Sequence, residues 1–285
     1  MTAAARPPKA ALLALGAIVL WATLASLGLA LARVPPFLLT GLALLVGSLI
    51  ALPLSKFQLS RFKVPLPTLA LGVYGLFGFH FLLFLALRHA PAVQANLVNY
   101  LWPLLMVVLA PLLLTGLRLR AVHLVAALLG FAGAALVILG GGSGVSAGWH
   151  WGYLPALGSA IIWASYSLLT QRVTPFPTAA VGSFALVSGL LSLLCHAVLE
   201  SATTLSAREG LLIIVMGLGP MGAAFFLWDK ALKLGDARHI GILSYLTPLA
   251  STALLLLVSG RTLTWNIALA AALIIGAALL GTRRN

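Results

Sequence analysis

The sequence Asn-Leu-Val-Asn-Tyr-Leu-Trp-Pro at residues 96–103 places two amides, a phenol, an indole and a proline inside the otherwise apolar run 90–114. On a helix, four of these residues fall at positions i, i+3, i+4 and i+7 and so share one face: Asn96, Asn99, Tyr100 and Pro103. A proline inside a helix frees a backbone carbonyl one turn back, which predicts a kink and a spare hydrogen-bond acceptor.

A second copy of this pattern occurs 145 residues later in the chain. Tyr-Leu-x-Pro-Leu is found at residues 100–104 and again at 245–249, and the second polar face consists of Gly241, Ser244, Tyr245 and Pro248. Two interrupted, polar helices at corresponding places are typical of duplicated membrane transporters, which bind substrate near the middle of the bilayer.

The composition excludes a soluble domain. Only 7% of the 285 residues are charged and 62% are hydrophobic, whereas soluble domains carry about a quarter charged residues. The net charge of +13 comes from bases scattered at the ends of apolar runs, which argues against a nucleic-acid partner. We therefore expect an all-α polytopic protein whose surroundings are the lipid bilayer.

Ten segments are apolar over about the 20 residues that a membrane helix needs. They cover residues 10–32, 36–54, 66–87, 91–114, 121–139, 151–171, 177–198, 210–231, 237–259 and 264–281. The first resembles a signal peptide, but it exceeds the roughly 7–15 residues of a signal core, so we expect it to remain as a helix. A glycine-rich link at 140–144 divides the chain, which predicts five-helix units over 1–142 and 143–285.

The two units are predicted to be inverted repeats. Trp21-Ala-Thr and Trp163-Ala-Ser lie 142 residues apart, and five spans per unit make the second unit enter the membrane from the opposite side. Lys and Arg number 13 on the side that holds both termini and four on the other, namely Arg33, Arg88, Arg208 and Arg261. The excess of bases predicts that both termini are cytoplasmic.

The polar and aromatic residues inside the spans are the candidate substrate-binding residues, because buried polar groups need a protein partner or a watery cavity. We expect a central cavity between the third, fourth, sixth and ninth helices. Asn96, Asn99, Ser244 and Tyr245 would hydrogen-bond the polar end of a small molecule, and Tyr100, Trp102, Trp163 and Tyr166 would contact its apolar part. In the alternative interpretation the amides clamp neighbouring helices and the rings form a tight core.

Other chemistry is poorly supported by the sequence. His80 lies within the third span and titrates near neutral pH, so it is either a packed residue or a member of the site. Asp229-Lys230 is interpreted as a solvated pair at a helix end. The chain has no paired carboxylates for catalysis, no His, Cys and acid cluster for a metal and no P-loop, so we predict neither enzyme activity nor a cofactor.

The ten spans and the pattern Ala90-x-Ala92 followed by Leu101-x-Pro103-Leu104 resemble the drug/metabolite transporter superfamily, EamA-like branch. The string 96–104 is similar to its subgroup of YddG-type aromatic amino acid exporters. The sequence Gly-Glu-Arg-Leu that is common in this branch is replaced at 116–119 and at 260–263. The resemblance implies a multi-pass protein of the bacterial inner membrane that exports aromatic amino acids and related small metabolites.

We expect alternating access by rocking of the two halves. One alternative is an exporter of the same fold for a different metabolite or drug, and a less favoured one is a non-transporting membrane enzyme or subunit. The small number of acids favours a facilitator or a carrier that responds to membrane potential, and His80 leaves proton coupling open. The sequence does not decide the oligomeric state or the substrate range.

Overall fold

The computed structural model describes residues 7–140, 148–259 and 265–281, and all regular structure in these residues is helical. The first half contains α1 (Pro7–Ala22), α2 (Leu24–Ala30), α3 (Pro36–Ser48), α4 (Ala51–Leu54), η1 (Leu59–Phe62), α5 (Leu66–Val73), η2 (Tyr74–Gly78), α6 (Phe79–His89), α7 (Ala92–Asn99), α8 (Trp102–Leu113) and α9 (Ala121–Gly140). The second half contains α10 (Tyr153–Leu169), η3 (Thr178–Ala180), α11 (Val181–Leu199), α12 (Ala207–Leu218), η4 (Gly219–Ala223), α13 (Ala224–Leu234), α14 (Ala237–Leu243), α15 (Leu246–Ser259) and α16 (Trp265–Gly281). Most of the predicted glycine-rich link, together with Arg6, Arg261, Arg283 and Arg284, lies outside the described residues.

The described helices are long and apolar, as the composition predicts. Seven segments within the described ranges can cross a bilayer: Lys9–Ala30, Pro36–Leu54, Leu66–His89, Ala92–Leu113, Ala121–Leu139, Thr178–Leu199 and Ala207–Leu234. Two further apolar helices, Tyr153–Leu169 and Trp265–Gly281, are shorter. The chain is therefore an all-helical, multi-pass membrane protein.

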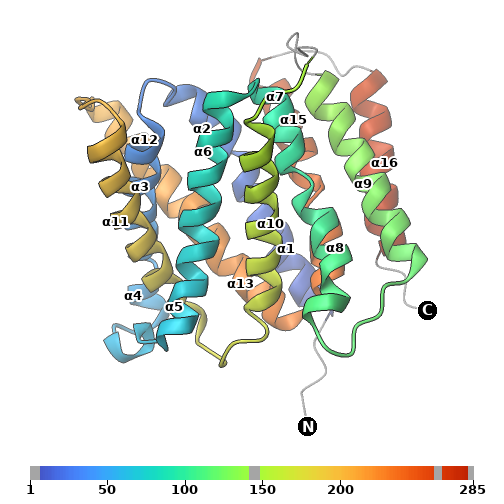
Figure 1. Ribbon diagram of the computed structural model, residues 1–285, viewed down its shortest axis with the longest axis horizontal. Helices are drawn as coiled ribbons and strands as arrows, with labels where there is room; N and C mark the ends of the chain where they lie inside the picture. Colours follow the sequence, from blue (N-terminus) through green and yellow to red (C-terminus); the bar gives the residue numbers. More distant parts are fainter. Residues whose placement is uncertain (1–6, 141–147, 260–264, 282–285) are drawn as a thin grey trace.

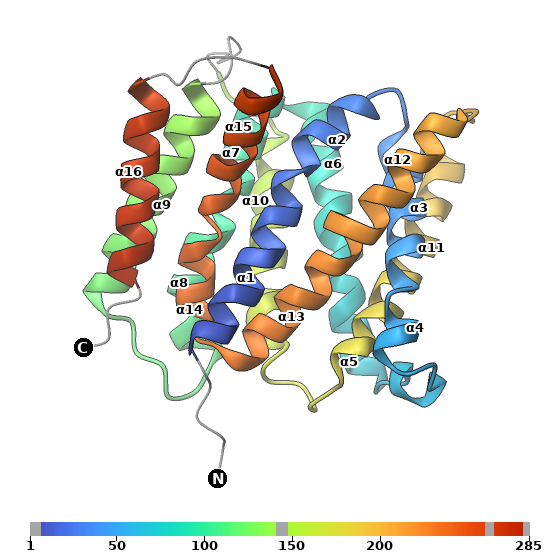
Figure 2. The same cartoon turned by 180° about the vertical axis from the view of Figure 1, so that it is seen from behind.

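The helices run side by side, roughly perpendicular to the longest axis of a broad bundle (Figure 1). α9 pairs with α16 at one side, and α3 pairs with α11 at the other. The centre is built from α1, α6, α8, α10, α13 and α14. α1 begins and α16 ends at the same end of the bundle (Figure 2), which we call the terminal end; the opposite end is called the far end.

Small residues let helices from the two halves approach closely. A Cβ added at Gly47 of α3 would lie 2.8 Å from the carbonyl oxygen of Met221 and 2.9 Å from that of Gly217. A Cβ at Gly217 would in turn lie 2.7 Å from the carbonyl oxygen of Ala43. Close backbone contact at small residues is a common way of packing helices in membranes, where the hydrophobic effect does not drive helix association.

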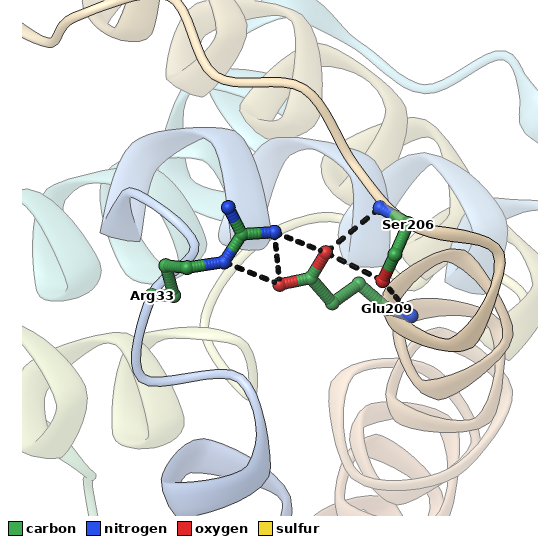
Figure 3. A network of polar contacts seen from close by, with 3 residues as sticks. All are labelled: Arg33, Ser206 and Glu209. Atoms are coloured by element: carbon green, nitrogen blue, oxygen red, sulfur yellow. Dashed lines mark hydrogen bonds and ion pairs between the residues drawn. The ribbon is translucent and has the colours of Figure 1, made fainter.

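At the far end, Glu209 connects the α2–α3 loop to α12 (Figure 3). Arg33 Nη2 donates to Oε2 of Glu209 at 2.8 Å, and the backbone N–H of Ser206 donates to the same oxygen at 2.8 Å. The Ser206 hydroxyl accepts from the backbone N–H of Glu209, which completes a capping box at the start of α12. The predicted far-side base Arg33 is thus neutralised by an acid on the same side.

Glu200 makes a second connection at the far end. Its carboxylate accepts hydrogen bonds from the backbone N–H groups of Phe37 and Leu38 at 3.0 and 3.2 Å, in the first turn of α3. The same carboxylate accepts from Arg88 at 3.1 Å and lies 3.0 Å from Nδ1 of His196. An anion at a helix N-terminus is favoured by the helix dipole, so Glu200 joins the start of α3 to the ends of α6 and α11.

Candidate functional site

Two helices are interrupted near the prolines singled out in the sequence. α7 ends at Asn99 and α8 begins at Trp102, one residue before Pro103. α14 ends at Leu243 and α15 begins at Leu246, two residues before Pro248. Proline lacks the N–H that would continue the helical ladder, and its ring clashes with the carbonyl four residues back, so each helix breaks before it.

The two interrupted helices lie against each other in the centre of the bundle. α14 contacts α8, and a Cβ at Gly241 would lie 3.2 Å from Cβ of Met106 and 3.3 Å from the carbonyl oxygen of Pro103. The glycine therefore brings α14 close to the first turn of α8. The two helices that carry the repeated polar pattern therefore meet where α14 contacts α8.

Seven aromatic rings fill the space beside this crossing, and we call them the aromatic cluster: Trp21, Phe79, Trp102, Trp163, Tyr166, Phe225 and Trp228. The ring of Trp163 is central, with centroids 5.4 Å from Phe79, 5.5 Å from Tyr166, 5.7 Å from Phe225 and 5.9 Å from Trp21. Trp102 lies edge-on to Trp163 at 6.4 Å. The rings come from α1, α6, α8, α10 and α13, so both halves of the chain contribute.

Phe225 and Trp228 are members that the sequence analysis did not predict, and Trp228 is the more buried of the two. It is 1% exposed, lies 5.1 Å from Trp21 and 5.6 Å from Trp102, and stacks on Trp163 at 6.3 Å with an interplanar angle of 26°. Its indole N–H donates to the Ser167 hydroxyl oxygen at 3.1 Å. The repeat gives no signal for it, because the position 145 residues earlier is Leu83.

His80 lies at the edge of the aromatic cluster as a packed residue. Its Nδ1 is 2.6 Å from the carbonyl oxygen of Leu76, so an N–H there donates within the preceding turn. The imidazole ring lies 5.0 Å from Phe79 and 6.4 Å from Phe225. The side chain is 8% exposed, and these contacts match the packed-residue interpretation while leaving the ring beside the cluster.

Asn99 connects the first interrupted helix to α10. Its amide oxygen accepts a hydrogen bond from the Ser159 hydroxyl at 2.9 Å, and both residues are buried. Asn96 and Tyr100 are half-buried on the same helix. For Asn99, the structure thus shows the helix-clamping contact that the sequence left as an alternative.

Replacing Ser159 with alanine is expected to lower the free energy of unfolding by about 1 kcal/mol, because the buried Asn99 amide loses its donor. The measurement is thermal or denaturant unfolding of the purified protein in detergent. A double-mutant cycle with Asn99→Ala isolates the pair, and additive effects of the two changes would contradict the contact.

Ser244 and Tyr245 do not join the aromatic cluster. The Ser244 hydroxyl donates to the carbonyl oxygen of Gly241 at 2.5 Å. The Tyr245 ring packs against Gly130 of α9, where an added Cβ would lie 2.4 Å from the ring, and it belongs to a separate core with Ala134 and Ile274. The structure therefore brings together Trp102, Trp163 and Tyr166 and places Tyr245 on the other side of α14.

A cavity of about 670 Å³ lies at the terminal end, one helical turn beyond the aromatic cluster. Its walls are formed by the start of α1, the α10–α11 connection, the end of α13, and α14. Its polar lining residues are Thr170, Gln171, Lys233, Asp236 and His239. The lining residues Thr170, directly after α10, and Leu232, on α13, follow Tyr166 and Trp228 by four residues, about 6 Å along each helix. Aromatic rings thus occupy the place where the sequence predicted the binding site, and the cavity lies between these rings and the terminal end.

The interpretation of Asp229 as a solvated partner of Lys230 is wrong. Asp229 is 4% exposed, and its Oδ2 accepts from Lys233 Nζ at 2.6 Å and from the Thr178 hydroxyl at 2.6 Å. Lys233 is one turn further along α13, on the same face as Asp229, and forms the ion pair, whereas no ion pair between Asp229 and Lys230 is found among the described residues. The pair connects α13 to the start of α11 beside the cavity.

Asp236 supplies a second charge at the cavity wall. Its carboxylate accepts from the backbone N–H and the guanidinium of Arg238, which also donates to the carbonyl oxygen of Arg118. Burial acts to raise the pKa of Asp236, but the hydrogen bonds from Arg238 outweigh it and hold the pKa below its usual value. Asp236 is therefore ionised at neutral pH. A second hollow of about 340 Å³ adjoins the first and shares Gln171, Gly235 and Asp236 with it.

Comparison with known proteins relates the chain to transporters. The sequence profile of the EamA-like transporter family matches residues 8–139 and 150–283. The aromatic amino acid exporter YddG of Ancylobacter novellus is 41% identical over 280 residues, which cover 96% of this chain and 97% of that protein. The protein of the same name from Salmonella typhimurium is 26% identical over 97% of this chain and 99% of its own length. A solved crystal structure superposes with a TM-score of 0.91 at 39% identity, covering 97% of this chain and 96% of the other.

Proposed function

The chain belongs to the EamA-like transporter family, and we propose that it exports aromatic amino acids and related small metabolites from the bacterial cytoplasm. It is thus a transporter and not an enzyme, as the sequence predicts. The structural observation that carries the substrate class is the aromatic cluster, in which buried rings from both halves meet between the spans. Such rings offer stacking and edge-on contacts to an aromatic side chain.

We propose ten spans in two inverted repeats. In this grouping the spans are α1–α2, α3–α4, α5–η2–α6, α7–α8, α9, α10, α11, α12–η4–α13, α14–α15 and α16. Helix contacts support it. The first span contacts the eighth (α1 with α13) as the sixth contacts the third (α10 with α6). The first span also contacts the ninth (α1 with α15) as the sixth contacts the fourth (α10 with α8). The two π-helical turns, η2 at Tyr74–Gly78 and η4 at Gly219–Ala223, lie at corresponding positions 145 residues apart.

The terminal end is proposed to face the cytoplasm. The excess of bases on that side supports this orientation. Two of the bases on the far side, Arg33 and Arg88, are paired with Glu209 and Glu200, which lowers the net positive charge there further. The cavity then opens toward the compartment from which an exporter takes its substrate.

The proposed mechanism is alternating access, with the described conformation facing inward. At the far end the start of α10 is closely packed: a Cβ at Gly152 would lie 2.6 Å from the carbonyl carbon of His89. The His89 and Trp151 rings lie 4.1 Å apart at the same place. A solute entering the cavity would reach the aromatic cluster and would leave when these far-end contacts separate.

The π-helical turns and the interrupted helices are the proposed points of bending. A π-helical turn and a helix break both lack part of the regular hydrogen-bond ladder, so they deform more easily than a continuous helix. Each half contains one of each at corresponding places. Rocking of one half against the other can therefore use the same pair of elements twice.

For the bound state we propose that Trp102, Trp163, Tyr166 and Trp228 contact the aromatic side chain of the substrate. Asn96, Asn99, Tyr100 and Ser244 lie on the interrupted helices that approach this cluster, and they are the proposed polar contacts, with His80 at its edge. Tyr245 packs against Gly130 in this conformation and is not assigned a ligand contact.

Export of labelled phenylalanine by purified protein in sealed vesicles tests the function. We expect saturable transport that unlabelled tyrosine and tryptophan inhibit and that aliphatic amino acids do not. Inhibition by a nucleoside or drug in place of the aromatic amino acids would move the assignment to another substrate of the same fold. Binding without movement across the bilayer would contradict transport altogether.

A further inference from the structure

The cavity at the terminal end contains charges of both signs in walls that are otherwise largely apolar. Lys233, which is paired with Asp229, lies at the end of α13, and Asp236, which is paired with Arg238, follows it before α14; both line the same hollow. An α-amino acid is a zwitterion whose carboxylate and ammonium group are attached to one carbon. A site with one cation and one anion complements both groups, which a site of a single charge does not.

Lys233 has a donor to spare for a ligand. An ammonium group has three N–H donors, and the described residues accept from it at two places: Asp229 at 2.6 Å and the carbonyl oxygen of Phe176 at 3.0 Å. The side chain is 28% exposed and lines the cavity. The buried Asp229 carboxylate fixes the position of the ammonium at the wall, where a carboxylate in the cavity can accept from it.

Gln171 and Phe176 complete the surroundings of that charge. The Gln171 side chain donates from Nε2 to the carbonyl oxygen of Leu232 at 3.1 Å, which fixes the amide with its oxygen as the acceptor left for a ligand. The Phe176 ring lies 3.8 Å from Lys233 Nζ, also at the cavity wall. The volume of about 670 Å³ is within the range of small-molecule sites and exceeds that of one amino acid.

We propose that this cavity is an entry site that binds the zwitterionic end of an α-amino acid, with the carboxylate at Lys233 and the ammonium at Asp236 and Gln171. The proposal rests on the proposed function and adds a recognition step before the aromatic cluster. Lys233 and Asp236 contact the substrate, and Asp229 acts as a positioning residue for Lys233. The site selects for the amino acid backbone, and the cluster one turn further on selects for the ring.

The test uses inside-out vesicles, which present the terminal end to the medium. Lys233→Met leaves the buried Asp229 without its partner, so the pair is removed together in Asp229→Asn/Lys233→Met, and Lys233→Arg keeps the charge. Lys230→Met is the matched control, since it removes the same charge from a position on the same helix that does not line the cavity. Size-exclusion profiles and thermal midpoints establish that each variant is folded.

The readouts are the KM for phenylalanine and the inhibition of its transport by phenylalaninamide, which lacks the carboxylate. In the wild-type protein phenylalanine should be preferred over the amide at least tenfold. The double variant should raise the KM for phenylalanine at least tenfold, change kcat less than twofold and abolish the preference. Lys233→Arg should retain most of the preference and Lys230→Met all of it.

An unchanged KM and preference in the folded double variant would overturn the entry site while leaving the exporter assignment intact. Absence of phenylalanine transport by the wild-type protein would instead overturn the proposed function. In that case the site is judged by calorimetric titration of phenylalanine and its amide into the purified protein. Equal affinities, or binding that the double variant retains, would overturn the site as well.

Discussion

Replacing Trp163 and Trp228 together with alanine is expected to lower phenylalanine export about 100-fold per molecule of folded protein. The two rings stack on each other at the centre of the aromatic cluster, and both contact Trp21 and Trp102. Each ring pair contributes about 0.5–1.5 kcal/mol beyond its buried area, so the loss of two contacts to a substrate ring at the upper end of this range, about 3 kcal/mol, amounts to a factor of about 100. Initial rates in vesicles with equal amounts of monodisperse protein measure it.

The matched control is Trp265→Ala, because Trp265 is 80% exposed at the start of α16. Its export rate should stay close to that of the wild-type protein. Since both cluster residues are buried, the conservative pair Trp163→Phe/Trp228→Phe separates folding from binding. This pair keeps aromatic rings in place, and we expect a smaller rise in KM with a nearly normal thermal midpoint. Wild-type export by the alanine pair would exclude the cluster from the transport path.

Replacing Gly47 with valine is expected to destabilise the protein by about 3 kcal/mol, the upper end of the range for overpacking. The added Cβ would lie within 3 Å of the carbonyl oxygens of Met221 and Gly217, and backbone atoms cannot move aside as a flexible side chain can. Helix α3 must therefore shift away from η4. The measurement is the thermal midpoint in detergent together with the yield of monodisperse protein.

Gly276→Val is the matched control, since nothing lies within 4 Å of a Cβ at that position. It should leave the midpoint nearly unchanged or raise it slightly, because valine restricts the unfolded chain more than glycine does. Equal midpoints for the two variants would contradict the close approach of α3 and η4, and with it the packing between the two halves.

Several features of the fold followed from the sequence on physical grounds. An apolar, charge-poor chain can only satisfy its backbone in a bilayer as helices or a closed barrel, and apolar runs of about 20 residues favour helices. Helix breaks near Pro103 and Pro248 follow from the missing N–H of proline. Trp163 was expected among the residues that face the interior, and its ring meets that of Trp21, its counterpart in the repeat, at 5.9 Å.

Other features depend on contacts between distant segments, which residue patterns do not show. Trp228 lies in an apolar run and has no counterpart in the first half. The Tyr245 ring packs against Gly130, which lies on α9 in the other half of the chain, so the direction of this side chain depends on a distant glycine. The ion pair of Asp229 with Lys233 has the i, i+4 spacing that favours such pairs on a helix, so it could have been predicted, but its burial depends on Thr178.

The cavity was expected at the centre and lies one turn away from it. Residue types indicate which side chains face the interior, but they do not state which end of a transporter is closed in a given conformation. Here the rings of the aromatic cluster contact one another, and the hollow remains between the start of α1 and the ends of α10 and α13. The position of the cavity is therefore a property of the conformation.

The central claim is that a solute passes from this cavity to the aromatic cluster between the interrupted helices. Labelling of Thr170→Cys in a Cys195→Ser background by a membrane-impermeant maleimide tests it most directly, with Lys230→Cys as the exposed control outside the cavity. We predict labelling of Thr170→Cys from the cytoplasmic face, slowed at least fivefold by saturating phenylalanine, and labelling of Lys230→Cys at an unchanged rate. A Thr170→Cys thiol that reacts only from the opposite face, or at the same rate with and without phenylalanine, would contradict the account.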